Sequence, residues 1–367
     1  DHTLGLYSYE SGRRSKEVSS TLDQSSKQNR TNRRKPDWVD LVAPYRQPDT
    51  KKSLWQLGNT FTLLILAWAA MYWSLAAGFW WVTLILAVPT AGLVVRLFII
   101  QHDCGHGSFF KSRKANDRLG TIISVFTMTP YLHWRKRHAI HHATSSNLDE
   151  RFIGDVPTWT VDEYLEKDTW DRLKYRVFRF PPMLFIILPF GLFFILHRIP
   201  SAGATKKERR GVYWTNIAIA VLWIILAAIV GWQAFLLVHI SVMWLAACIG
   251  TWLFFVQHQF EDTYWEHQEE WEYSLAALQG SSYYKLPKVL QWFTGNIGFH
   301  HIHHLSPRIP NYLLEKCHNE NQLFQNVITM TLRTSLETIF LSLWDKNQKK
   351  LISFRQLRLQ QRAEAGV

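Results

Sequence analysis

The chain has 367 residues, of which 47% are apolar and 18 are Trp, and its formal net charge is +12. This length fits one large domain or two, and a basic protein can bind nucleic acid or anionic lipid. Because the apolar residues are concentrated in long uncharged blocks, the composition favours a membrane protein and argues against a nucleic-acid partner.

The first fifty residues are polar and rich in Ser, Gln, Lys and Arg. Such a segment offers too little apolar surface to form a packed core, and it contains no apolar stretch of the kind found in signal peptides. We therefore predict that residues 1–50 form a basic and largely disordered tail on the cytosolic side.

Two long segments, residues 54–95 and 213–257, contain no Asp, Glu, Lys or Arg. A helix needs roughly 20 apolar residues to cross a membrane, so each segment is long enough for two crossings and a tight turn. The sequence predicts two helical hairpins. Their membrane-spanning helices are expected at about residues 54–77, 79–100, 213–231 and 234–257.

Two shorter apolar stretches are ambiguous. Residues 119–132 are too few to cross a membrane, and we expect them to be interfacial or re-entrant. Residues 183–196 are interrupted by Pro189 and Gly191 and are flanked by Lys and Arg on both sides. Because basic flanks favour the cytoplasmic side, we expect this stretch to dip in and return, or to lie on the surface. A true crossing is the alternative.

Four crossings place the N-terminus, residues 97–212 and residues 258–367 on one side of the membrane. Neither loop on the other side carries a basic residue, so the charge pattern assigns the shared side to the cytoplasm. The predicted fold is an all-α integral membrane protein with four transmembrane helices. A membrane domain at residues 51–355 is expected to include interfacial helices and a cytosolic helical cap at residues 101–212 and 258–355, followed by a basic tail at residues 356–367.

Many of the 16 histidines are grouped in three clusters with helical spacing. Residues three or four apart share one face of a helix, so the members of a cluster can converge on one point. All three clusters fall on the predicted cytoplasmic side. They consist of His102 and His106; of His138, His141 and His142; and of His300, His303 and His304, with His301 beside them.

This number of histidines implies two metal ions. Imidazole binds Zn, Cu, Fe and Ni, and one zinc ion takes about four ligands. The Glu-x-x-His motif of carboxylate di-iron bundles does not occur among the clusters, so we predict an all-nitrogen site. The three cysteines are far apart and lack a Cys-x-x-Cys motif, which argues against a thiolate zinc site.

Three further residues are candidates for the site. His258 stands at the inner end of the fourth predicted span, where it can bind metal or make a supporting or headgroup contact. Asp103 can orient a ligand imidazole through its other ring nitrogen, or it can be a solvated carboxylate. His301 is an alternative ligand to His300, and we favour His300 because it repeats the spacing of the second cluster.

At these residues the sequence resembles the membrane fatty-acid desaturases, whose histidine boxes follow the patterns His-x3/4-His, His-x2/3-His-His and His-x2-His-His. Longer strings resemble more closely the bacterial acyl-lipid desaturases of the delta-12 and delta-5 type, and the resemblance extends from about residue 50 to residue 355. These strings are HDCGHGSFF at 102–110, HAIHHATSSNLD at 138–149, VQHQFEDTYW at 256–265, GSSYYKLPKVLQWFTGN at 280–296 and HHIHHLSPRIPNY at 300–312.

The resemblance implies an oxidoreductase of a bacterial cell membrane that uses two non-haem irons and dioxygen. Its substrates would be acyl chains of membrane lipids, and a separate donor such as a ferredoxin, with its reductase, would supply electrons. One departure follows the second box, where Phe152 and Ile153 stand in a segment that is usually glycine-rich. The ligands implied by the family motifs are His102, His106, His138, His141, His142, His258, His300, His303 and His304.

Two other functions remain open from the sequence. A membrane hydroxylase or ketolase uses the same histidine boxes on lipid or hydrocarbon substrates. A non-enzymatic haem protein would place histidines opposite one another within the spans, and here only His239 lies within a predicted span.

Overall fold

The computed structural model describes residues 36–366. Residues 1–35, which make up most of the predicted tail, lie outside the described part of the chain. The chain divides into two compact units, at residues 1–43 and 44–367. The described portion of the first unit contains one short helix, α2 (Asp37–Val42), and everything below concerns the second unit.

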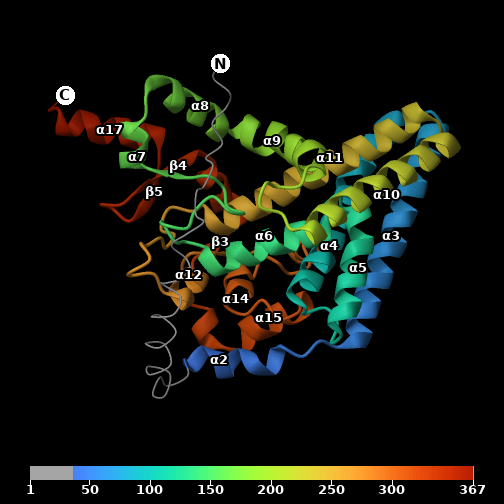
Figure 1. The fold of residues 1–367 in the computed structure, drawn as a ribbon, viewed down its shortest axis with the longest axis horizontal. Helices are drawn as coiled ribbons and strands as arrows, with labels where there is room; N and C mark the ends of the chain where they lie inside the picture. Colours follow the sequence, from blue (N-terminus) through green and yellow to red (C-terminus); the bar gives the residue numbers. More distant parts are fainter. Residues whose placement is uncertain (1–35, 367) are drawn as a thin grey trace. The chain divides into compact units, whose positions relative to one another are not determined.

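Four helices of the second unit are long and apolar enough to cross a membrane, which confirms the four predicted spans. They form two hairpins whose helices run side by side in Figure 1. At the far end of each hairpin a glycine with a φ of 86°, Gly78 or Gly231, makes the tight turn. A positive φ is readily adopted only by glycine. The helices are α3 (Thr50–Ala76), α4 (Trp80–His106), α10 (Lys206–Val230) and α11 (Trp232–His258).

The helices extend beyond the predicted spans on the histidine side, where capping residues set the ends of three of them. Asp49 accepts hydrogen bonds from the backbone N–H groups of Lys51 and Lys52 and begins α3. Thr205 and Glu208 form a capping box that begins α10. Gly107, with a φ of 72°, ends α4 directly after His106. The first histidine cluster is therefore carried on the last turns of a spanning helix.

Helix α5 (Arg113–Phe126) turns back into the bundle, and α6 (Tyr131–Thr144) returns from it. The Phe126 ring lies 5.5 Å from the Phe61 ring and 6.5 Å from the Trp68 ring of α3, so the end of α5 lies among the spans. The ambiguous stretch at residues 119–132 is therefore re-entrant in form, and it delivers α6 with its histidines to the inner end of α4.

The second ambiguous stretch forms a continuous helical segment, Met183–Arg198, which includes α9 (Leu188–Phe190) and wide turns on either side. It meets α8 (Thr169–Arg179) at a bend of 61°. Arg179, just before it, donates a hydrogen bond to Gln259, and Ser201, just after it, contacts His133. Both ends of the segment therefore lie near the histidine end of the bundle, where the charge pattern places them.

The remaining elements form a cap with more extended structure than an all-α fold implies. One sheet has the strand order β1-β4-β5, with β1 parallel to β4 (Trp159 opposite Leu343) and β4 antiparallel to β5. The other pairs β2 with β3 in parallel. The strands are β1 (Trp159–Thr160), β2 (Tyr283–Tyr284), β3 (Thr329–Met330), β4 (Leu341–Asp345) and β5 (Lys350–Ser353).

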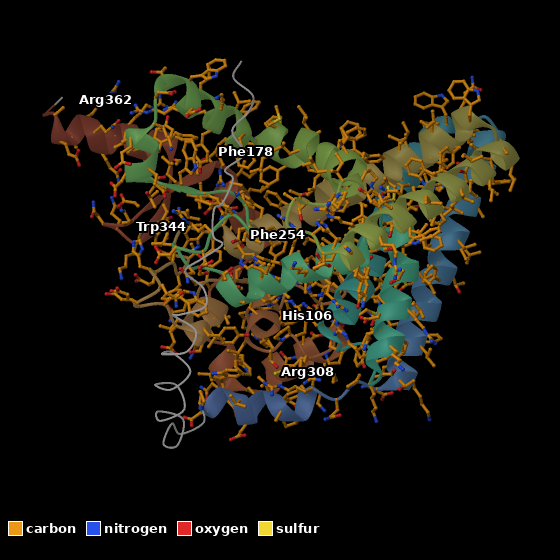
Figure 2. All side chains as sticks on the ribbon, viewed as in Figure 1. His106, Phe178, Phe254, Arg308, Trp344 and Arg362 are labelled. Atoms are coloured by element: carbon orange, nitrogen blue, oxygen red, sulfur yellow. The ribbon has the colours of Figure 1, made fainter. Side chains whose placement is uncertain are left out.

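Short helices complete the cap, and the predicted C-terminal tail falls largely within the last of them. Ser353 and Gln356 form a capping box that begins α17, and Leu357 on this helix is buried. Trp344 of β4 and Arg362 of α17 mark this part of the molecule in Figure 2. The helices are α7 (Val161–Glu166), α12 (Tyr273–Leu278), α13 (Lys288–Phe293), α14 (His300–Leu305), α15 (Asn311–Glu320), α16 (Leu332–Glu337) and α17 (Phe354–Glu364).

Gly298 gives a test of how tightly the third histidine cluster is seated. Its carbonyl accepts a hydrogen bond from the N–H of Tyr284 at 2.7 Å, and an added Cβ would lie 2.4 Å from the Tyr284 carbonyl oxygen. We expect Gly298→Ala to destabilise the protein by about 1–3 kcal/mol, as overpacking does, and to lower the apparent melting temperature in detergent. In the matched control, Gly250→Ala within α11, an added Cβ meets nothing within 4 Å. An equal melting temperature for the two variants would show that Gly298 is not tightly packed.

Candidate metal centre

Four helix ends bring the histidines together. The last two turns of α4 carry His102 and His106, α6 carries the second cluster, and α11 ends at His258. The short helix α14 supplies the third cluster. His106 lies near α6 and α14 in Figure 2, and its ring centroid is 4.9 Å from those of His138 and His303. Segments more than 200 residues apart in sequence therefore meet at one place.

The nitrogens of these rings form two groups. The first group draws on α4, α6 and α14, and the second on α6, α11 and α14; within each group the candidate ligand atoms lie within 4.8 Å of one another. His300 adjoins the second group, because its Nε2 atom is 3.0 Å from Nε2 of His258. The first group is His102, His106, His138, His142 and His303, and the second is His141, His258 and His304.

The donor set fits metal ions better than it fits a hydrogen-bond network. Nε2 of His142 lies 3.1 Å from Nε2 of His138 and 3.0 Å from Nε2 of His303. A neutral imidazole carries one proton, so three such nitrogens facing one another cannot all be satisfied without a shared cation. Nε2 of His106 and Nε2 of His304 are buried without a hydrogen-bond partner. Two metal ions, one in each group, would satisfy these atoms.

Electrostatics also favour metal binding. Burial, reinforced by neighbouring imidazoles, lowers the pKa of five ring systems well below the ordinary histidine value. At neutral pH these imidazoles are uncharged, and each keeps a lone pair for a metal ion. The five are His138, His142, His300, His303 and His304.

Partners outside the nitrogen cluster orient two of the rings. Nδ1 of His141 lies 2.5 Å from a carboxylate oxygen of Asp155, and Nδ1 of His258 lies 3.3 Å from the Gly280 carbonyl oxygen. Each contact directs Nε2 of the same ring toward the second group. Carboxylate and carbonyl partners of this kind fix the tautomer and orientation of metal-binding histidines.

Asp103 has a different main partner from the predicted one. Its Oδ2 atom accepts hydrogen bonds from the backbone and side-chain N–H groups of Asn311, at 2.7 and 2.8 Å. Its Oδ1 atom is 3.5 Å from Nδ1 of His102, beyond a good hydrogen bond. The buried carboxylate therefore ties the end of α4 to the start of α15, in addition to lying beside a ligand candidate.

His301 faces away from the cluster. Its Nε2 atom lies 3.1 Å from the Phe324 carbonyl oxygen, and its ring centroid is 5.4 Å from that of His318. Burial lowers the pKa of His301 to about 3, so this ring is also neutral. Of the two adjacent histidines, His300 lies beside the second group and His301 does not.

Sequence reasoning missed Asp155, which follows the unusual Phe152–Ile153 pair. Phe152 has a φ of 77°, a conformation that favours glycine, and the Arg151 guanidinium lies 5.1 Å from its ring centroid. An added Cβ on Gly154 would lie 3.1 Å from the His141 Cβ, so the loop that contains Gly154 packs directly on α6. The Gly-Asp pair within the segment that resembles the desaturases was the available signal.

The sequence model for fatty acid desaturases matches residues 78–331, which is more than half of the chain. The chain belongs to the fatty acid desaturase family. It is therefore an oxidoreductase, and the predicted resemblance is confirmed. A fatty acid desaturase of Bacillus subtilis is 49% identical over 317 residues, which cover 86% of this chain and 90% of the relative.

More distant relatives are named as acyl-lipid enzymes. The sn-1 oleoyl-lipid 12-desaturase of Anabaena variabilis is 26% identical to this desaturase, over 68% of this chain and 72% of the relative. The sn-1 acyl-lipid omega-3 desaturase (ferredoxin) of Nostoc is 27% identical, over 82% of each chain.

The contact between His141 and Asp155 predicts a loss of metal in Asp155→Asn. The amide removes the charge that holds the ring, and loss of such a partner typically lowers metal affinity or activity about 10–100-fold. We expect less bound metal per purified chain after dialysis against a weak chelator, measured by elemental mass spectrometry.

Asp149→Asn is the matched control, because Asp149 contacts the exposed His267 at 2.8 Å, outside the two groups. We expect its metal content to equal that of the parent chain. If Asp155→Asn retained as much metal as the parent chain, Asp155 would not support the centre.

Proposed function

We propose that this desaturase introduces a cis double bond into acyl chains of membrane lipids, with dioxygen as co-substrate and two non-haem irons as cofactor. The observation that carries the proposal is the pair of imidazole groups at one end of a bundle of four apolar helices, two of which, α4 and α11, carry members of the groups. The names of the acyl-lipid relatives support the choice of lipid acyl chains.

The candidate ligands would form two metal positions. The first group would hold one iron, and the second group with His300 would hold the other. Bound there, the irons would supply the oxidising power that, with dioxygen, removes two hydrogens from neighbouring methylenes. Neutral imidazoles suit iron, and the protein supplies position and exclusion of water.

Apolar surface reaches the second group from the spans. The Phe254 ring of α11 lies 5.2 Å from the rings of both His141 and His258. An acyl chain that lies along such a surface is shielded from water and can approach the imidazoles without breaking a hydrogen bond. The protein thus contributes a water-free, fixed position for a segment of the substrate that has no polar group to bind.

The proposed location is a bacterial cell membrane, with the metal centre and both termini facing the cytoplasm. The basic residues around the start of α10 and the uncharged far turns support this orientation. A ferredoxin or similar protein, with its reductase, would supply electrons, as the name of the Nostoc relative suggests.

A membrane hydroxylase or ketolase is the alternative, since it would use the same histidines. The relatives named above are desaturases, which favours removal of two hydrogens over retention of oxygen. A hydroxyl or keto oxygen in the product would decide for the alternative.

Expression in a host that lacks desaturases tests the proposal. We expect a new unsaturated fatty acid in membrane lipids, located by mass spectrometry, when a competent donor is present. His141→Ala removes a ligand candidate, so product should fall to background while the protein stays in the membrane. His267→Ala, outside both groups, should leave product unchanged. Absence of any unsaturated product from the metal-loaded parent chain would refute the proposed reaction.

Cysteine labelling tests the orientation. We expect Ala77→Cys and Gln233→Cys, at the far turns of the two hairpins, to react with a membrane-impermeant maleimide added to intact cells. Gln348→Cys, between β4 and β5 in the cap, should react only after the cells are opened. The parent chain, with Cys104 and Cys317 buried, gives the background. The reverse pattern would place the metal centre outside.

A further inference from the structure

Three segments near the first histidine group form a strongly basic surface. They are the stretch that leads into and through the first turns of α5, the middle of α6, and the start of α10. Their acidic residues are Asp117 and Glu208 alone. Their basic residues are Lys111, Arg113, Lys114, Arg118, Arg135, Lys136, Arg137, Lys206, Lys207, Arg209 and Arg210.

A cavity of about 340 Å³ lies within this basic surface. Basic side chains from all three segments line it, among them Arg113, Arg135 and Lys207, and Gly105 and Ala139 also reach it. A concave site with this excess of positive charge favours an anionic partner.

The same cavity adjoins the most accessible edge of the metal centre. Of the nine ligand candidates, seven are buried, whereas His106 and His138 are partly exposed. Gly105 precedes His106 in sequence, and Ala139 follows His138. Trp134 stacks on the His138 ring, with centroids 4.6 Å apart and planes 16° from parallel. The edge formed by His106, His138 and Trp134 therefore offers an electron a short path from the protein surface to the first group.

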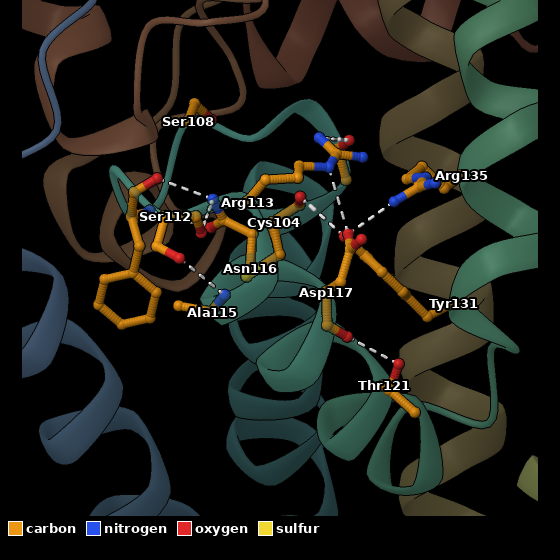
Figure 3. A network of polar contacts seen from close by, with 12 residues as sticks. Cys104, Ser108, Ser112, Arg113, Ala115, Asn116, Asp117, Thr121, Tyr131 and Arg135 are labelled. Atoms are coloured by element: carbon orange, nitrogen blue, oxygen red, sulfur yellow. Dashed lines mark hydrogen bonds and ion pairs between the residues drawn. The ribbon is translucent and has the colours of Figure 1, made fainter.

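The basic groups near this edge are held in place. Asp117 lies between two guanidinium groups, 3.3 Å from Arg113 and 2.6 Å from Arg135, and it accepts a hydrogen bond from the Tyr131 hydroxyl (Figure 3). Arg113 also donates to the Gly105 carbonyl oxygen at 3.2 Å. Rigid positive groups beside a redox site suit a partner whose orientation matters.

We propose that this surface docks an acidic one-electron carrier protein, with its redox group facing His106, His138 and Trp134. The inference rests on the proposed function, which requires an external electron source. Anionic lipid headgroups share the charge of such a carrier, but they have no reason to gather at the exposed edge of the histidines. An electron carrier has such a reason, because electron transfer slows steeply with distance.

The test uses charge reversal away from the histidines. Lys114→Glu, Arg118→Glu and Lys207→Glu are combined in one chain, since all three side chains are exposed. The control combines Arg355→Glu, Arg358→Glu and Arg362→Glu on α17, which are also exposed and give the same change in charge. The probe is a recombinant acidic bacterial ferredoxin, and its affinity for each iron-loaded chain in detergent is measured at two salt concentrations.

We expect the first variant to weaken ferredoxin binding about tenfold or more, and added salt to weaken binding to the parent chain. The control variant should bind like the parent chain. Equal binding by both variants, or equal losses in both, would overturn the docking surface. If the first variant instead loses affinity only for phosphatidylglycerol vesicles and keeps ferredoxin binding, the surface binds lipid headgroups and the proposal is wrong.

A single turnover separates this inference from the proposed function. Each chain is reduced with dithionite, without ferredoxin, and then exposed to dioxygen in the presence of lipid. The docking variant should give as much unsaturated product per chain as the parent. Less product would mean that the substitutions damaged the site and would overturn the docking explanation. No product from the parent would refute the proposed reaction, whereas the binding results would still decide the docking surface.

Discussion

The need to bring unprotonated imidazole nitrogens to one place governs this structure. Their nitrogens approach within about 3 Å of one another, as at His142 and His303, and without a shared cation such buried polar atoms cost free energy. Helix ends from distant parts of the sequence must therefore be held against one another by other contacts. Much of the cap can be understood as the means of holding them.

The holding contacts are made by residues other than the histidines. The carbonyl oxygens at the end of α4 accept hydrogen bonds from outside the helix, Cys104 from the Tyr131 hydroxyl and Gly105 from Arg113. Asp103 binds Asn311, and Asn311 accepts a hydrogen bond from the Gln56 side chain of α3 at 2.8 Å. The Arg113 contact gives a partner to a carbonyl group at the helix end, and together the contacts fix the position of α4 relative to α6 and α15.

The spans and the ligand candidates were predictable from the sequence, and their supports were not. Uncharged length and helical spacing are local signals, so they identify the hairpins and the three clusters directly. The partners of the ligands are set by contacts between distant segments, as between Asp155 and His141 or between Gly280 and His258. The small sheets arise in the same way, since β1 and β4 are too short to show a periodicity and pair across a long stretch of chain.

Helical spacing alone also misses how the clusters are shared between the two groups. Each of the second and third clusters was expected to converge on one point, but the structure divides both. In α6 the pair four residues apart, His138 and His142, joins the first group, and His141 joins the second. In α14 the division is reversed, because His303 joins the first group while His304 joins the second and His300 adjoins it.

This reversal has a structural consequence. Two rigid helices each reach both groups, so the separation of the groups is fixed by the width of a helix face and does not depend on a bridging carboxylate. Histidines three and four residues apart lie on slightly different faces of a helix, and that small angular difference directs one ring to each metal position. The same spacing that made the clusters recognisable as candidate metal ligands thus also sets the distance between the two groups of imidazole nitrogens.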